Sequence, residues 1–154
     1  MFGRIIAIAL FLIIFITVLL HQRDFSISGP CEGNFTATVS RVIDGDTLVV
    51  DECSEHIRLA LANTPEKDQN GWTEATAFTS KLCKVGSSVN IRQDEGQPYD
   101  VYGRIVALVY CQNKILNEEL IKNNLAVIST QYCSRSIFAT ENWAWNNGCN
   151  INEN

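Results

Sequence analysis

The stretch 41–50 places acidic residues in a turn between two apolar runs rich in β-branched residues. Asp44-Gly45 predicts a two-residue hairpin turn, because glycine tolerates the positive φ angle that such turns require. Asp46 and Thr47 follow where the second strand begins, so carboxylates gather at a strand tip. A turn of this kind also forms simply because Asp side chains accept backbone hydrogen bonds. The turn alone is compatible with a reactive site and with a solvated turn, so other segments are needed to distinguish the two interpretations.

Three further side chains could take part in chemistry at such a site. Stabilising an anionic group needs positive charge on its oxygens, and attack by water needs a base or an orienting group. Arg58 and Arg104 suit the first task, because guanidinium groups stay charged and match phosphate bidentately. Glu66 follows Thr64-Pro65, where the proline favours an extended conformation of the preceding residue. The alternatives are ordinary strand arginines in ion pairs and an exposed loop glutamate.

Alternating or β-branched segments predict the strands that would position these side chains. Five strands are expected, with a further extended segment near the C-terminus: 35–43, 48–51, 57–61, 87–92, 105–110 and 125–128. The first three form a meander. A polar acidic loop, 93–101, precedes the fifth strand.

Three helices are expected. The apolar residues of the segment 72–83 recur at intervals of three and four, which predicts a helix whose aromatic residues belong to the core. Asn117 is a candidate N-cap of a second helix that ends near Lys122, and Thr140 of a third that Gly148 ends. A helix between strands three and four matches an OB-fold. The predicted class is α+β, mainly β: a five-stranded OB-fold barrel with three helices.

The N-terminus predicts a membrane-anchor helix before the barrel. Residues 5–20 are apolar except for one threonine, and charged residues flank them. This run lies between the lengths of a cleavable signal and a full membrane span. We expect a signal anchor or signal peptide over 1–22, a linker over 23–33 and one domain over 34–154. The expected location is the cell membrane with an extracellular domain, or secretion after cleavage.

Six cysteines follow the apolar run, and none lies within it. An even number in an exported domain predicts structural disulfides, and spacing alone leaves fifteen pairings open. The absence of a Cys-x-x-Cys pair argues against a zinc or thioredoxin-like site. The sequon at Asn34 can carry a glycan only where the export route glycosylates.

The formal net charge of −5 does not indicate adhesion to nucleic acid, because an acidic protein repels polyanions at long range. Any chemistry on nucleic acid would need a local positive site or a bound cation.

Several short motifs resemble, in order and spacing, those of the staphylococcal nuclease (thermonuclease) family. They are Val42-Ile43-Asp44-Gly45-Asp46-Thr47, Ile57-Arg58-Leu59, Thr64-Pro65-Glu66, Asp100-Val101-Tyr102-Gly103-Arg104, Leu116-Asn117-Glu118 and Leu125-Ala126. The resemblance covers about residues 36 to 132. It implies an OB-fold barrel with three helices and a calcium-dependent nuclease activity on DNA, and also on RNA.

The resemblance also implies a role for each candidate residue. Arg58 and Arg104 would be catalytic by stabilising charge on the phosphate, and Glu66 by activating or orienting water. Asp46, Asn63 and the backbone carbonyl of Thr64 would be the metal ligands, and Ca²⁺ suits such hard oxygen ligands.

Two departures from the family pattern stand out. Asn63 replaces a second metal-binding Asp, which removes one negative charge and predicts weaker calcium binding. Val101 replaces a lysine that helps to hold a terminal phosphate. Tyr102 persists beside it, and Tyr132 matches an aromatic residue that can pack on a nucleotide, so both are substrate-binding candidates.

The C-terminal segment resembles a cysteine-bearing, exported branch of this family. On that basis Cys133 is expected to pair with Cys149 and Cys83 with Cys111. Cys31 and Cys53 are then the two cysteines without an assigned partner.

The favoured interpretation is an exported nuclease with little sequence specificity that acts by in-line attack of water on phosphorus. Its expected partners are DNA and RNA as substrates and the membrane; we expect a monomer without a protein partner. One alternative is a catalytically impaired nucleic-acid-binding OB module, which Asn63 supports. The other is a disulfide-braced interaction domain, which leaves the two arginines and Glu66 unexplained.

Overall fold

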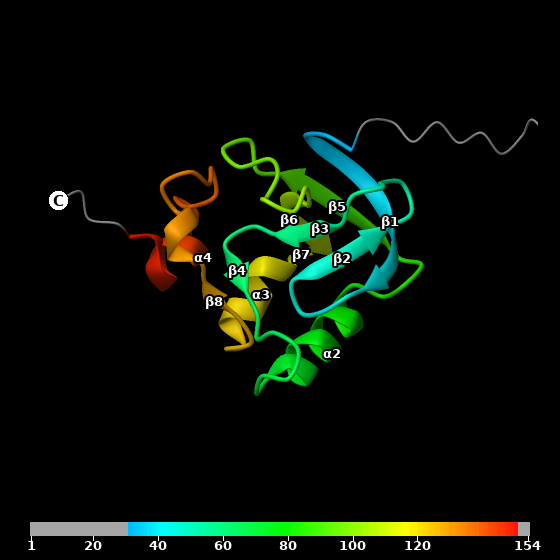
Figure 1. Cartoon of the computed structure of the whole chain (residues 1–154), viewed down its shortest axis with the longest axis horizontal. Coiled ribbons are helices and arrows are strands. Elements are labelled where there is room, and N and C mark those ends of the chain that lie inside the picture. The colour runs from blue at the N-terminus through cyan, green and yellow to red at the C-terminus, as the bar shows by residue number, and fades with distance from the viewer. Residues whose placement is uncertain (1–30, 151–154) are drawn as a thin grey trace, which may run out of the picture.

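A closed five-stranded barrel forms the centre of the computed structural model, which describes residues 31–150. Its strands are β1 (Asn34–Val42), β2 (Thr47–Val50), β3 (Ile57–Leu59), β5 (Ser88–Gln93) and β6 (Ile105–Cys111). They pair antiparallel in the order β3-β2-β1-β5-β6, and a parallel pairing of β3 with β6 closes the barrel (Figure 1). The predicted OB-like barrel of the α+β class is therefore confirmed.

The burial of the strands follows their sequence pattern. Alternate residues of β5 are buried, as expected of a strand with one face on the core and the other in solvent. Six of the seven residues of β6 are buried, because one face lines the barrel and α3 packs against this strand. The side chains of Leu48, Ile57, Leu59, Ile91, Ile105 and Leu108 lie among the most deeply buried of the core.

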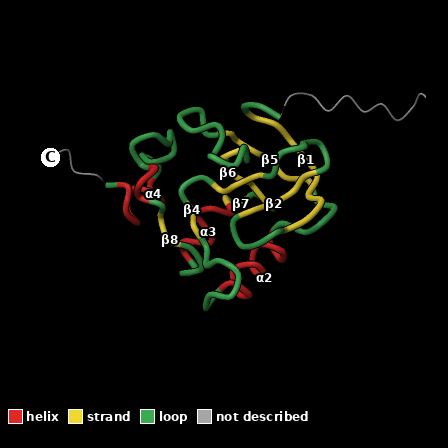
Figure 2. The backbone as a smooth tube through the Cα atoms, in the orientation of Figure 1, coloured by secondary structure: helices red, strands yellow, loops and turns green. Residues whose placement is uncertain are grey.

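Shorter elements surround the barrel (Figure 2). The helices are α2 (Trp72–Leu82), α3 (Leu116–Lys122) and α4 (Asn142–Ala144), with 3₁₀ and π turns at Thr130–Tyr132 and Trp145–Cys149. β7 (Lys114–Ile115) extends the edge of β6, while β4 (Ala62–Asn63) and β8 (Val127–Ile128) form a separate antiparallel pair. In Figure 1, α2 lies below β2 and α4 lies on the opposite side of the molecule from β1.

The acidic turn differs from the predicted two-residue hairpin. Val42 pairs with Leu48, and the Ile43 N–H donates to the Thr47 carbonyl at 2.9 Å, so the connection is longer. Gly45 does not have a positive φ angle. Glycine is required there by close packing instead, because a Cβ atom would lie 2.7 Å from the side chain of Thr64.

The predicted N-cap role of Asn117 is wrong, since Ile115 is the N-cap of α3 and the helix begins at Leu116. Asn117 is fully buried. Its amide donates to the carbonyls of Ala60 and Ala107 at 2.9 and 3.1 Å and accepts from the Val109 N–H at 3.2 Å. The side chain therefore joins α3 to the barrel.

The C-terminal helix also differs from its prediction. Glu141, not Thr140, is the N-cap of α4, and its carboxylate accepts a hydrogen bond from the Trp143 indole at 2.9 Å. Gly148 interrupts the segment as predicted, since its φ of 140° and ψ of −10° are not helical angles and suit only glycine.

Three disulfides join Cys31 to Cys53, Cys83 to Cys111 and Cys133 to Cys149. The last two are the pairs expected from the resemblance, and the first joins the two remaining cysteines. Part of the expected linker is thereby fixed to the barrel, since Cys31 is bonded and the Gly33 N–H donates to Gln93 at 2.9 Å.

The expected membrane anchor over 1–22 lies outside the described residues. Within 31–150, no helix has the length and apolar character needed to cross a membrane.

Candidate functional site

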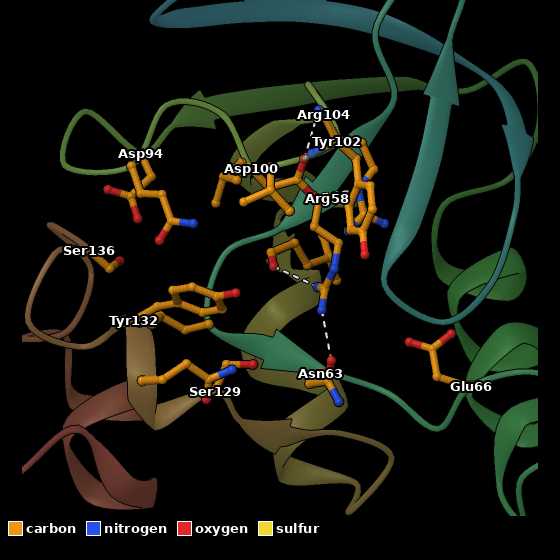
Figure 3. Close-up of a pocket in the computed structure, with 16 residues that line it drawn as sticks. Arg58, Asn63, Glu66, Asp94, Asp100, Tyr102, Arg104, Ser129, Tyr132 and Ser136 are labelled. Carbon is orange, nitrogen blue, oxygen red and sulfur yellow. Dashed lines mark hydrogen bonds and ion pairs between the residues drawn. The ribbon is translucent and has the colours of Figure 1, made fainter.

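A cleft at one end of the barrel gathers most of the predicted site residues (Figure 3). Its lining comes from β3, β4, the loop before β6 and the segment after β8, which are far apart in the sequence. The lining residues are Arg58, Leu59, Leu61, Asn63, Glu66, Asp94, Gln97, Asp100, Val101, Tyr102, Arg104, Val106, Ser129, Gln131, Tyr132 and Ser136. The barrel therefore brings both arginines and Glu66 to one surface.

Asp46 lies beside this cleft and is 5% exposed. Its Oδ2 accepts hydrogen bonds from the N–H of Thr64 at 2.7 Å and from the Thr64 hydroxyl at 2.9 Å. Its Oδ1 accepts from the Thr47 hydroxyl at 3.2 Å. Asp44 shapes the turn by accepting the Asp46 N–H at 3.1 Å, and burial together with the negative charge of Asp46 raises the pKa of Asp44.

Arg58 joins the acidic turn to the β3–β4 connection. Its Nε lies 3.3 Å from Asp46 Oδ1. The two terminal nitrogens donate to the carbonyls of Leu59 and Ala62 at 2.8 and 2.6 Å and to Asn63 Oδ1 at 2.9 Å. Because the guanidinium is held on several sides, its position is defined closely by its neighbours.

Arg104 is oriented by Asp100, four residues earlier. Arg104 Nε donates to Asp100 Oδ2 at 2.6 Å, and the backbone N–H groups of Tyr102 and Arg104 donate to Oδ1 at 2.9 Å each. Partial burial alone would raise the pKa of Asp100, but these hydrogen bonds and the arginine charge lower it. Arg104 also lies 3.4 Å from the Thr47 hydroxyl, which connects it to the acidic turn.

Glu66 differs from these residues because it is exposed. It lies past Pro65 in the loop before α2, where its backbone N–H donates a hydrogen bond to Gln69 Oε1 at 2.9 Å. Figure 3 shows its carboxylate apart from the arginines, on the side of the cleft nearest α2. An exposed carboxylate in this place is accessible to water.

Two of the three predicted metal ligands, the side chains of Asp46 and Asn63, lie close together. Asp46 Oδ1 and Asn63 Oδ1 both contact the same Arg58 guanidinium, and Thr64 directly follows Asn63. The two side-chain oxygens therefore already converge on a cation, and hard oxygen donors of this type suit Ca²⁺. Within residues 31–150, no three His, Cys, Asp or Glu side chains gather around one point. The only carboxylate in the predicted ligand set is that of Asp46.

The two predicted substrate-binding tyrosines lie at different ends of the cleft. Tyr102 is 81% exposed, and the Arg104 guanidinium lies over its ring at 5.4 Å from the centroid. Tyr132 is half-buried, and Arg135 lies over it at 5.9 Å. In Figure 3 Arg58 lies between the two tyrosines.

The sequence analysis did not single out the far wall of the cleft. Asp94, 1% exposed, accepts hydrogen bonds at Oδ1 from the N–H groups of Gly96 and Ile137, at 3.1 and 3.0 Å, while its Oδ2 is buried without a partner among the described residues. Ser129, Gln131 and Ser136 also line this wall. The sequence predicted only a polar, acidic loop here, because the backbone N–H that binds the buried Asp94 carboxylate lies 43 residues away.

This closed barrel, with two arginines at a carboxylate-bearing strand tip, belongs to the OB-fold class. Comparison with known proteins is more specific. Residues 56–151 match the family described as staphylococcal nuclease homologue. The chain is 32% identical to a thermonuclease of Staphylococcus hyicus over 133 residues, which cover 80% of this chain and 78% of that protein.

Two other relatives match over shorter segments. The chain is 32% identical to endonuclease YncB of Bacillus subtilis over 102 residues, 62% of this chain and 48% of that protein. It is 33% identical to a thermonuclease of Staphylococcus intermedius over 95 residues, 57% of this chain and 56% of that protein. The chain thus spans about half the length of these two relatives. With more than half of its residues matched by the family model, it belongs to the staphylococcal nuclease family.

Proposed function

We propose that this chain is a calcium-dependent nuclease that hydrolyses DNA and RNA with little sequence specificity. Family membership supports the general activity, hydrolysis of phosphodiester bonds, and the relatives are named as thermonucleases and an endonuclease. The cleft offers no recognition helix that could enter a groove and discriminate base pairs. Accessible or single-stranded sites are therefore the proposed substrates.

The convergence of Arg58 and Arg104 on one cleft is the observation that carries this proposal. Arg58 is tied to Asp46, and Arg104 is close to the neighbouring Thr47, so both guanidinium groups are positioned by the same strand tip. Two fixed guanidinium groups can bind the equatorial oxygens of a phosphate and stabilise the charge that develops during displacement. When a phosphate binds to Arg58, the guanidinium would lose some of the hydrogen bonds that it makes to its neighbours in this structure.

Glu66 is the proposed base or water-orienting group. Its exposed carboxylate can accept a proton from water that attacks phosphorus in line with the departing 5′ oxygen. Ca²⁺ held by Asp46, Asn63 and the Thr64 carbonyl would supply positive charge where the phosphate approaches. This charge matters because the chain carries a net charge of −5.

A cleavage assay tests the proposal. Single-stranded DNA is incubated with the full-length chain in calcium or in chelator, and Glu66→Gln is compared with wild type. Glu74→Gln is the matched control, since Glu74 is an exposed residue of α2 outside the cleft lining. We expect calcium-dependent cleavage that Glu66→Gln removes and Glu74→Gln retains. Binding without cleavage would indicate a non-catalytic nucleic-acid-binding module instead.

We also propose that the domain works outside the cytoplasm, anchored to the membrane by residues 1–22 or secreted after cleavage. The support comes from the apolar N-terminal run and from the three disulfides, which persist in oxidising compartments. Cell fractionation, with the N-terminus of the mature protein determined by mass spectrometry, distinguishes the two routes. An intact chain in the cytoplasm with reduced cysteines would contradict both.

A further inference from the structure

The charges that line the cleft leave little free positive charge for a polyanion. Arg58 and Arg104 are the lining cations, whereas Glu66, Asp94 and Asp100 are lining carboxylates. Arg58 is paired with Asp46 and Arg104 with Asp100. A nucleic-acid strand brings one negative charge per nucleotide, so nucleotides beyond the scissile phosphate need another cation.

Arg135 is positioned to provide that cation. It is exposed, and its guanidinium carbon lies 5.9 Å from the centre of the Tyr132 ring, which lines the cleft. Arg135 forms no ion pair with any other residue in the described part of the chain, unlike the two arginines inside the cleft. Its charge is therefore available to an incoming anion.

The loop that carries Arg135 is fixed firmly to the barrel. The N–H groups of Arg135 and Ser136 both donate to the Tyr132 carbonyl, at 3.0 and 2.9 Å, and the neighbouring Cys133 is bonded to Cys149. The Arg135 carbonyl packs against Gly96 so closely that a Cβ atom there would lie 1.8 Å away. Arg135 and Tyr132 are thus held as one unit against the opposite loop.

We propose that Arg135, held beside the substrate-binding candidate Tyr132, binds a phosphate of the strand beyond the scissile one. The ligand is single-stranded nucleic acid, and the inference rests on the proposed nuclease function and deepens it. Stacking on an aromatic ring combined with an adjacent cation binds a strand without selecting its sequence.

The opposite end of the cleft supports the same mode of binding. Arg104 lies over the ring of Tyr102 at 5.4 Å, so each end presents a tyrosine with an arginine on its face. Figure 3 shows Arg58 between the two rings. A strand that contacted both rings would also pass close to Arg58.

The test compares wild type with Arg135→Gln and Arg135→Lys in the full-length chain. Arg41→Gln is the matched control, because Arg41 is an exposed arginine on β1 outside the cleft lining. Binding of a single-stranded DNA of about ten nucleotides, made cleavage-resistant with phosphorothioate linkages, is measured in calcium over a series of salt concentrations. Values of kcat and KM are measured with the same sequence carrying ordinary linkages.

For Arg135→Gln we expect the affinity to fall about two- to fivefold, as for an exposed ion pair. The slope of log affinity against log salt should shrink by about 0.7, the value for one phosphate contact on a single strand. KM should rise with kcat unchanged, and Arg135→Lys should restore the slope. An Arg135→Gln variant with the affinity and slope of wild type would overturn this inference while leaving the nuclease intact. A wild type that neither binds nor cleaves DNA would overturn the proposed function itself.

Discussion

Arg58 donates a hydrogen bond to Asn63 Oδ1 at 2.9 Å while its Nε lies 3.3 Å from Asp46 Oδ1. One guanidinium thus bridges two of the three proposed metal ligands. An amide at position 63 satisfies this contact but adds no negative charge. The proposed metal affinity therefore depends mainly on Asp46.

Asn63→Asp should strengthen calcium binding, because it adds a second carboxylate to a ligand set of hard oxygens. We expect about a tenfold lower dissociation constant, which corresponds to roughly 1.4 kcal/mol. Calorimetric titration with Ca²⁺ measures it without reference to activity. Asn90→Asp is the control, since it adds the same charge at an exposed position of β5. Unchanged calcium affinity in Asn63→Asp would contradict the proposed ligand set.

Arg58→Lys should lower kcat by about 10²- to 10³-fold, the usual effect of losing one donor that stabilises transition-state charge. A lysine ammonium cannot reproduce the planar set of donors that Arg58 directs to Asp46, Asn63 and two carbonyls. Steady-state kinetics on single-stranded DNA measures the effect. Arg41→Lys, on the exposed face of β1, should match wild type. If the Arg58→Lys variant retained most of the activity, the proposed catalytic role of Arg58 would be wrong.

The strands and the first helix could be predicted because their signals are local. Alternating burial in β5 and the spacing of three and four in α2 are patterns within one segment. Positions governed by distant contacts could not be predicted in the same way. Gly45 is required by Thr64 and not by its own φ angle, and Asp94 is bound by Ile137 from a loop 43 residues later.

The candidate site shows the same division between local and distant information. The acidic turn, the two arginines and Glu66 lie within short motifs of the family, so the resemblance indicated each of these residues. The position of Arg135 beside Tyr132 depends on how a disulfide-braced loop packs against Gly96, which no short motif records.

Asn117→Ala should destabilise the fold by about 2 to 4 kcal/mol, because it removes a buried amide and leaves the Val109 N–H without its side-chain acceptor. The Ala60 and Ala107 carbonyls retain backbone hydrogen bonds from Ala62 and Ala60, which limits the loss. Denaturant unfolding measures the change. Asn123→Ala is the control, since its exposed amide bonds only to the Glu119 carbonyl. Equal stability of both variants would contradict the bridging role.

The stability of the barrel should fall with acid partly through Glu52. Burial alone would raise the pKa of Glu52, but the N–H and hydroxyl of Thr38 donate to its carboxylate at 2.7 and 2.9 Å and lower the pKa below 4.5. The folded state therefore binds this proton less tightly than the unfolded state. The stabilisation is complete above about pH 4.5 and disappears as the pH falls through the folded-state pKa.

Glu52→Gln should accordingly lower the free energy of unfolding at neutral pH by about 1 kcal/mol, because the amide keeps one acceptor oxygen for Thr38 but loses the other acceptor and the negative charge. It should also make the dependence of stability on pH shallower below pH 4.5, because the group that titrates there is gone. Denaturant unfolding at a series of pH values measures both effects. Glu95→Gln, in the exposed turn before β6, should keep the acid dependence of wild type. A Glu52→Gln variant with the same pH slope as wild type would mean that the Thr38 hydrogen bonds do not favour the ionised carboxylate.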